Sequence, residues 1–114
     1  CIPLAFALDR QLDRIAAEGI ENRWKRHLEM QSMTLAWAEQ HGFTPFVADP
    51  AHRSPTVSAL TNGPLDGADI VARAKAAGFT LGRGYGELKA TTFRIGHMGD
   101  HTVARLRALL DAIA

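Results

Sequence analysis

Residues 93–101, with the sequence FRIGHMGDH, hold the side chains of this chain that are best suited to chemistry. Arg94 stands between Phe93 and Ile95, where a strand would ordinarily carry an apolar or neutral residue. An arginine offers a planar fork of N–H donors that can meet a carboxylate with two parallel hydrogen bonds. Held on a strand beside the small Gly96, such a fork would be a rigid anion clamp. The local pattern is equally compatible with an edge-strand arginine that points into water.

The same stretch contains two histidines, His97 and His101, whose spacing would place two metal ligands on one face of a helix. Gly96 and Gly99 disfavour a helix at this point, and no third ligand is evident nearby. We therefore interpret both histidines as turn residues without a ligand role, and we predict no metal site. The remaining histidines are scattered along the chain and carry no such signal: His27, His41 and His52.

Other candidate chemistry is weaker. The acidic residues are interspersed with basic ones on predicted helix faces, which is typical of solvated surfaces and not of paired catalytic carboxylates. The glycine-rich run GRGYG, residues 82–86, lacks the strand, loop and helix context of a phosphate-binding loop, so we interpret it as a flexible loop that lets backbone approach a ligand. A Schiff-base lysine needs a partly buried site. The three lysines are instead predicted to lie on the surface: Lys25, Lys75 and Lys89.

Length and composition describe an ordinary small globular chain. It has 114 residues, of which 46% are hydrophobic and 22% charged, and this size suits one domain. The net charge of +1, with both signs interspersed, argues against a nucleic-acid surface. No apolar run approaches the roughly 18 residues of a membrane span. The single cysteine, Cys1, excludes an internal disulfide framework and indicates a reducing compartment, which we take to be the cytoplasm.

The N-terminal part is predicted to form two helices, because residues 4–18 and 20–41 both show apolar side chains at helical spacing. Gly19 interrupts the pattern between them, and Gly42 suits the left-handed position that follows a helix. The predicted stripe of the second helix contains Trp24, Leu28, Gln31, Leu35 and Ala38, widened by Met30, Met33 and Trp37. A stripe this broad is expected to pack on more than one surface.

The rest of the chain alternates between strands and helices. Strands are predicted at residues 43–48, 56–61 and 91–95, and helices at residues 67–77 and from about His101 to the end. Asp66 is the predicted N-cap of the first of these helices, with Asp69 in a capping-box position. We therefore predict an α+β fold, a small and mostly antiparallel three-stranded sheet with helices on one face, preceded by a long interdomain helical segment.

Three segments resemble the C-terminal part of class V aminotransferases, which are fold-type I pyridoxal-phosphate enzymes. FRIGHMG, preceded by GYGELKATT and followed by an amphipathic helix, is similar to their Arg-Ile-Gly motif. EGIEN and the Arg-His pair a few residues later resemble the segment that joins their two domains, and FVADPAHRSPTV resembles the strand, loop and strand that follow it. The resemblance covers essentially the whole chain and is nearest to alanine/serine–glyoxylate and archaeal-type phosphoserine aminotransferases. Cysteine desulfurases share the fold but fit the Arg-Ile-Gly-His-Met-Gly form less well.

This resemblance implies a small domain without its catalytic partner. It assigns to Arg94 the binding of the α-carboxylate of amino-acid and keto-acid substrates, and it places Tyr85 and Gly86 near the substrate. The catalytic lysine and the pyridoxal 5'-phosphate site of the family would lie in a large domain outside this chain, which alone would be inactive and bind no cofactor. The full-length enzyme would be a homodimer.

Within this scheme, residues 1–41 would be the interdomain and first small-domain helices, and residues 42–114 the α+β small domain. The start at Cys1 without a signal peptide is expected for a fragment of a longer protein. The alternative is a stand-alone module, without catalysis, for small-molecule binding or oligomerisation. The reading frame upstream of Cys1 would discriminate between the two.

Overall fold

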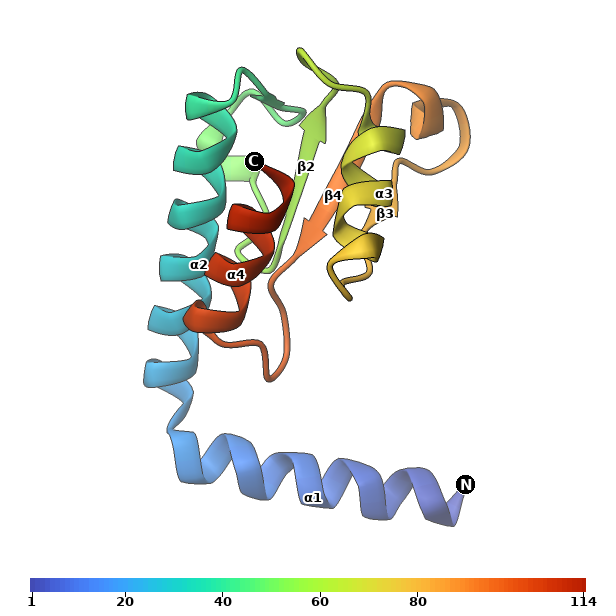
Figure 1. Ribbon diagram of the computed structural model, residues 1–114. Coiled ribbons are helices and arrows are strands. Elements are labelled where there is room, and N and C mark those ends of the chain that lie inside the picture. Colours follow the sequence, from blue (N-terminus) through green and yellow to red (C-terminus); the bar gives the residue numbers. More distant parts are fainter.

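Two long helices joined at a glycine begin the chain. The computed structural model describes residues 1–114, in which α1 spans Ile2–Glu18 and α2 spans Ile20–Gln40. Gly19 has φ 83° and ψ 129°, a backbone conformation open in practice only to glycine. The chain therefore turns sharply there, and α1 projects as an arm from the body of the molecule (Figure 1). No helix of the chain combines the length and apolar character that a bilayer crossing needs.

The body is a layer of helices on one four-stranded antiparallel sheet. The strands are β1 (Thr44–Pro45), β2 (Val57–Thr61), β3 (Gly82–Arg83) and β4 (Thr92–Gly96), in the order β1-β2-β4-β3. Helices α3 (Gly67–Ala76) and α4 (Val103–Ile113) lie with α2 over one face of the sheet (Figure 1). Two short 3-10 helices interrupt the loops, at Pro50–His52 and Gly86–Ala90.

The predicted α+β class is confirmed, but the predicted number of strands was wrong. The sheet has a fourth strand, β3, inside the glycine-rich stretch that we had interpreted as a loop. Its two residues pair with Phe93 and Arg94 of β4, and so short a strand has no alternating pattern of its own. The strand predicted at 43–48 is also only two residues long, because Pro45 cannot donate to a continuing ladder.

Strand β4 brings the helices and the sheet together. Phe93 and Ile95 are completely buried on the helix side of the sheet. Phe43 packs edge-on against Phe93, with ring centroids 5.1 Å apart, and stacks on Trp37 of α2 at 5.4 Å. The predicted apolar stripe of α4 supplies much of the remaining core through Leu106, Leu109, Leu110 and Ile113. Helix α3 adds Ile70 and Ala74.

The buried face of α2 is not the stripe expected from the sequence. Met30, Trp37 and Ala38 are buried as predicted, but Trp24 and Leu28 are 59% and 52% exposed. The remaining buried positions of α2 are polar or charged: Arg23, His27 and Thr34. The helix therefore carries two apolar faces, of which the body of this chain buries only one.

The ends of the helices largely follow the capping residues. Asp66 accepts a hydrogen bond from the backbone N–H of Ala68, which confirms the predicted N-cap of α3. The last helix begins at Val103 and not at His101, because the hydroxyl of Thr102 caps it by accepting from the Arg105 N–H. Gly42 has a positive φ of 75° just beyond α2, as predicted for that position.

Candidate functional site

Arg94 lies in the middle of β4 on the face of the sheet that the helices leave open. Its two neighbours, Phe93 and Ile95, point into the core, so strand alternation directs Arg94 to the opposite face, where it is exposed. The side chain is fixed at one point, since its Nε donates a hydrogen bond to the carbonyl oxygen of Arg83 at 3.0 Å. The sheet thus holds an arginine at a defined position on a surface otherwise available to a ligand.

The space around the guanidinium depends on glycine. Gly82 faces Arg94 directly across β3 and β4, and a Cβ atom on Gly82 would come within 3.1 Å of Nη2 of Arg94. Because Nε is already used, the two terminal nitrogens remain, and neither makes a hydrogen bond in the structure. An incoming carboxylate could therefore meet the fork end-on through Nη1 and Nη2.

A shallow cleft of about 280 Å³ surrounds this position. No acidic side chain lines it, so nothing competes with a ligand anion for the arginine. Its lining is small or apolar apart from Arg94, Thr80 and His101; the remaining residues are Val57, Gly82, Gly96 and Met98. The cleft thus presents one cationic side chain, Arg94, to an incoming anion.

The glycine-rich loop has a structural explanation of its own. At Gly84 a Cβ atom would lie 2.1 Å from the Thr92 hydroxyl and 2.2 Å from the carbonyl oxygen of Leu88, so no side chain fits there. Tyr85 is 87% exposed, and Gly86 has a φ of +57°. Neither of them lines the cleft at Arg94, and their placement near a substrate stays a prediction.

The two histidines of the opening stretch occupy different environments. His97 is fully buried, with its Nε2 3.1 Å from the Ser58 hydroxyl, whereas His101 is exposed just before α4. Burial, together with the nearby His27 and His101, lowers the pKa of His97 to about 4, so its ring is neutral at physiological pH. Neither residue lies in a helix, and the chain has no group of three His, Cys, Asp or Glu side chains that could hold a metal ion.

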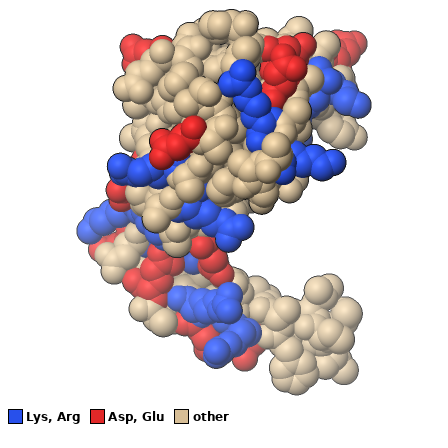
Figure 2. Space-filling view, viewed as in Figure 1, with Lys and Arg blue, Asp and Glu red and all other residues tan.

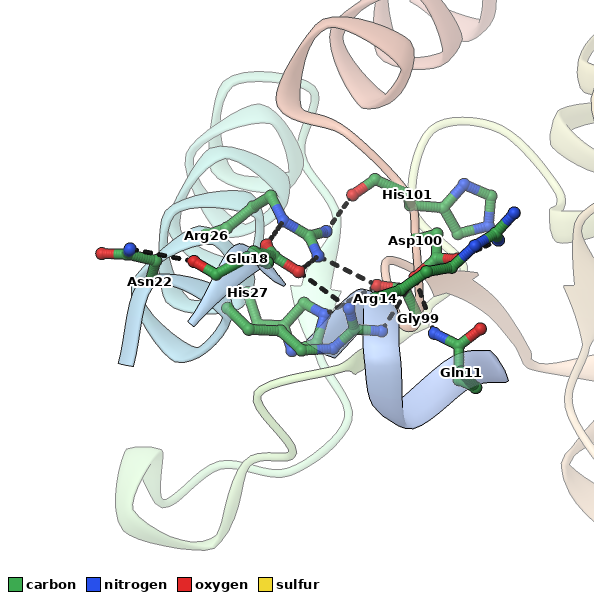
Figure 3. Close-up of polar contacts among 10 residues, drawn as sticks. Gln11, Arg14, Glu18, Asn22, Arg26, His27, Gly99, Asp100 and His101 are labelled. Atoms are coloured by element: carbon green, nitrogen blue, oxygen red, sulfur yellow. Dashed lines mark hydrogen bonds and ion pairs between the residues drawn. The ribbon is translucent and has the colours of Figure 1, made fainter. Parts of the chain in front are cut away.

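A polar cluster that the sequence did not indicate lies where α1 meets α2 (Figure 3). Arg23 is only 7% exposed, and it donates to Glu18 at 2.8 Å and to Asp100 at 3.0 Å. Hydrogen bonds from Arg26 and Arg23 lower the pKa of Glu18, and those from Gln11 and Arg23 lower the pKa of Asp100. Both carboxylates therefore stay ionised to a lower pH than an ordinary carboxylate does.

This cluster joins the two stretches of sequence that were singled out separately. The segment that runs from EGIEN to the Arg-His pair, residues 18–27, provides Glu18, Arg23 and Arg26, and FRIGHMGDH provides Asp100 and the carbonyl oxygen of Gly99. In the sequence the acidic residues stand close to basic ones and look like parts of solvated helix faces. The pairing with position 100 depends on the fold, and no local spacing could have indicated it.

Comparison with known proteins gives a consistent set of relatives, although no family model matches the chain. A serine–glyoxylate aminotransferase of Arabidopsis thaliana is 32% identical over 98% of this chain and 28% of its own length. A 2-aminoethylphosphonate–pyruvate transaminase of Aeromonas hydrophila is 36% identical over 97% of the chain and 29% of its length. The chain thus spans less than a third of the curated relatives it matches.

The fold leads to the same group of proteins. The crystal structure of an alanine–glyoxylate aminotransferase from Nostoc sp. superposes with a TM-score of 0.79 at 28% sequence identity. The superposition covers 90% of this chain and 28% of that one. Sequence and structure therefore agree on the region matched as well as on the kind of protein.

Proposed function

Because the chain belongs to the class V aminotransferase family, whose C-terminal region it matches, we propose that it is the small domain of a pyridoxal-phosphate-dependent aminotransferase. In that enzyme Arg94 would bind the α-carboxylate of the amino-acid or keto-acid substrate. The observation that supports this role is the open guanidinium on β4, with two unpaired terminal nitrogens in a cleft without acidic side chains. The relatives named above differ in substrate, so the proposal extends to the carboxylate and not to the rest of the substrate.

We propose that this chain does not itself hold pyridoxal phosphate. A Schiff-base lysine needs a partly buried position. The three lysines of this chain are all exposed, and none lines the cleft at Arg94: Lys25, Lys75 and Lys89. We propose that the cofactor is held by the part of the enzyme that corresponds to the unmatched length of the relatives. When bound there, the cofactor supplies the electron sink of the reaction, while this chain orients the substrate.

The arm and α2 offer a surface suited to that missing part. Five large apolar side chains of α1 are more than half exposed: Ile2, Leu4, Phe6, Leu8 and Leu12. On the face seen in Figure 2, the outer end of the arm shows no Lys, Arg, Asp or Glu. Trp24 and Leu28 of α2 are also exposed, so the apolar surface continues past the bend at Gly19. We propose that these faces pack against the large cofactor-binding domain and against the second subunit of a homodimer.

The test is substitution of Arg94 in the full-length enzyme. Each hydrogen bond between charged groups contributes about 1.5–3 kcal/mol, so loss of two corresponds to a decrease of about 150- to 25,000-fold in kcat/KM. Arg94→Ala is expected to lower kcat/KM for amino acids by at least this lower value, and Arg94→Lys to recover only part of it, because an ammonium group cannot reproduce the fork.

Arg107→Ala is the matched control, since Arg107 is an exposed arginine of α4 that makes no hydrogen bond or ion pair. It is expected to leave kcat/KM unchanged. The visible absorption of the bound cofactor should be the same in all three variants, which separates substrate binding from loss of cofactor. Unchanged kcat/KM in Arg94→Ala would refute the proposed role of this residue.

A further inference from the structure

The direction of α1 is not determined by apolar packing within this chain. None of its residues is buried, and its largest apolar side chains face solvent. A helix in this situation could swing about its connection to the rest of the molecule. Gly19, the connection itself, has no side chain to restrict such a movement, and its φ of 83° lies in a region that other residues rarely adopt.

What does hold α1 is a set of hydrogen bonds at the elbow, which we name the elbow clasp. Its members are two carboxylates, three arginines and one amide: Glu18 and Asp100, Arg14, Arg23 and Arg26, and Gln11 (Figure 3). They come from α1, from α2 and from the loop between β4 and α4. The clasp thus joins three elements, and the partners of Asp100 on α1 are 86 and 89 positions away in the sequence.

Asp100 is the point at which the arm is attached to the body. Its two oxygens accept from Gln11 at 3.0 Å, from Arg14 at 3.1 Å and from Arg23 at 3.0 Å. Two of these donors belong to α1 and are well along the arm from Gly19, so they resist a change in its angle. Arg23 belongs to α2 and provides the fixed side of the same contact.

Glu18, the residue before Gly19, forms the second part of the clasp. One of its oxygens accepts from Arg23 at 2.8 Å and the other from Arg26 at 2.6 Å, while Arg26 also donates to the carbonyl oxygens of Gly99 and His101. Arg23 is almost completely buried between two carboxylates. Removing one partner from a buried charge is far more costly than breaking an exposed ion pair, so these contacts are expected to be kept in solution.

We propose that the elbow clasp sets the angle at which α1 leaves the body, with Gly19 as the hinge and Asp100 as the anchor. Since Asp100 lies on the segment that continues from β4, the clasp also fixes the arm relative to the strand that carries Arg94. The proposal concerns this chain alone and does not depend on its enzymatic role.

The angle can be measured with spin labels at the far ends of the two helices. Cys1, the only cysteine, is exposed at the tip of α1, and Glu39→Cys places a second label on the exposed surface near the end of α2. The separation of these labels depends directly on the angle at Gly19. Excess unlabelled chain, added before pulsed dipolar spectroscopy, removes distances between molecules that associate through α1.

Two variants remove the contacts from opposite sides. Asp100→Asn takes away the charge that receives all three donors, and Asp111→Asn, on the exposed surface of α4 without a hydrogen bond, is its matched control. Because Asp100→Asn also deprives Arg23 of a partner, the double variant Gln11→Ala/Arg14→Ala provides an independent test. It removes the same contacts from α1 and leaves the buried arginine intact.

The unaltered chain and Asp111→Asn are expected to give one narrow distribution of distances. Asp100→Asn and the double variant are expected to broaden and shift that distribution, while the double variant keeps the melting temperature of the unaltered chain. A narrow, unshifted distribution in the double variant would overturn the proposal, whatever the behaviour of Asp100→Asn. A broad distribution already present in the unaltered chain would overturn it as well.

Discussion

Acidification is expected to destabilise this chain through His97. The ring is fully buried, and burial lowers its pKa to about 4, against about 6.5 in an unfolded chain. Between these values the unfolded state binds the additional proton, so the free energy of unfolding falls as the pH falls. The contribution of His97 is therefore complete above pH 6.5 and is lost progressively as the pH approaches 4.

The difference of the two pKa values corresponds to about 3 kcal/mol over the whole transition, of which about 2 kcal/mol is lost between pH 7.5 and pH 5. Glu18 and Asp100 act in a lower range. Since their pKa values are lowered by hydrogen bonds from arginine and glutamine, their contribution is present above their ordinary pKa values of 4.5 and 3.8 and is lost below them. Measurements that end at pH 5 thus stay above the range in which these two carboxylates lose their contribution.

The assay is urea unfolding at several pH values for the unaltered chain, for His97→Gln and for His52→Gln as control. His97→Gln retains a hydrogen-bonding amide but cannot titrate, so its stability should vary about 2 kcal/mol less than that of the unaltered chain between pH 7.5 and 5. His52 is exposed and lies 3.3 Å from a carboxylate oxygen of Asp49, and its replacement is the control for a histidine-to-glutamine change at the surface. Parallel curves for the unaltered chain and His97→Gln would refute the reasoning.

Two further predictions concern stability, both measured by urea unfolding at neutral pH. Gly84→Ala is expected to cost about 3 kcal/mol, because the new methyl group would overlap backbone and the Thr92 hydroxyl, whereas Gly86→Ala meets no atom within 4 Å and should cost about 1 kcal/mol from its positive φ alone. Equal losses of stability in Gly84→Ala and Gly86→Ala would show that the loop rearranges to accommodate the methyl group. Phe93→Ala should cost about 3–5 kcal/mol, while Phe6→Ala, at a position 71% exposed, should stay within about 0.5 kcal/mol; a large loss at Phe6 would mean that α1 packs within this chain.

The sequence was most informative where a single element carries its own pattern. The helices at 67–77 and in the last part of the chain were predicted because their apolar residues recur at helical spacing, and Asp66 indicated where one of them begins. Strand β4 was predicted from its own residues, and Arg94 was noticed because it breaks the apolar pattern there. Such features depend on near neighbours in the chain, which a sequence displays directly.

The features that were missed depend on distant partners. Strand β3 exists only because Gly82 and Arg83 pair with β4, and nothing in two residues could indicate it. The face of α2 that is buried was misjudged because both faces contain apolar residues, and the choice between them is made by what packs against the helix. The elbow clasp was missed for the same reason, since Asp100 acquires its role from side chains at the opposite end of the chain.

Three polar side chains of residues 94–100 lie in three different parts of the molecule. Arg94 points to the open face of the sheet, His97 into the core, and Asp100 to the elbow. A continuous strand could not do this, because its side chains alternate between only two faces. Gly99, with a φ of +66°, turns the backbone just before Asp100 and leaves its own carbonyl oxygen for Arg26. Gly99 therefore redirects the chain between the core, where His97 lies, and the elbow clasp, where Asp100 lies.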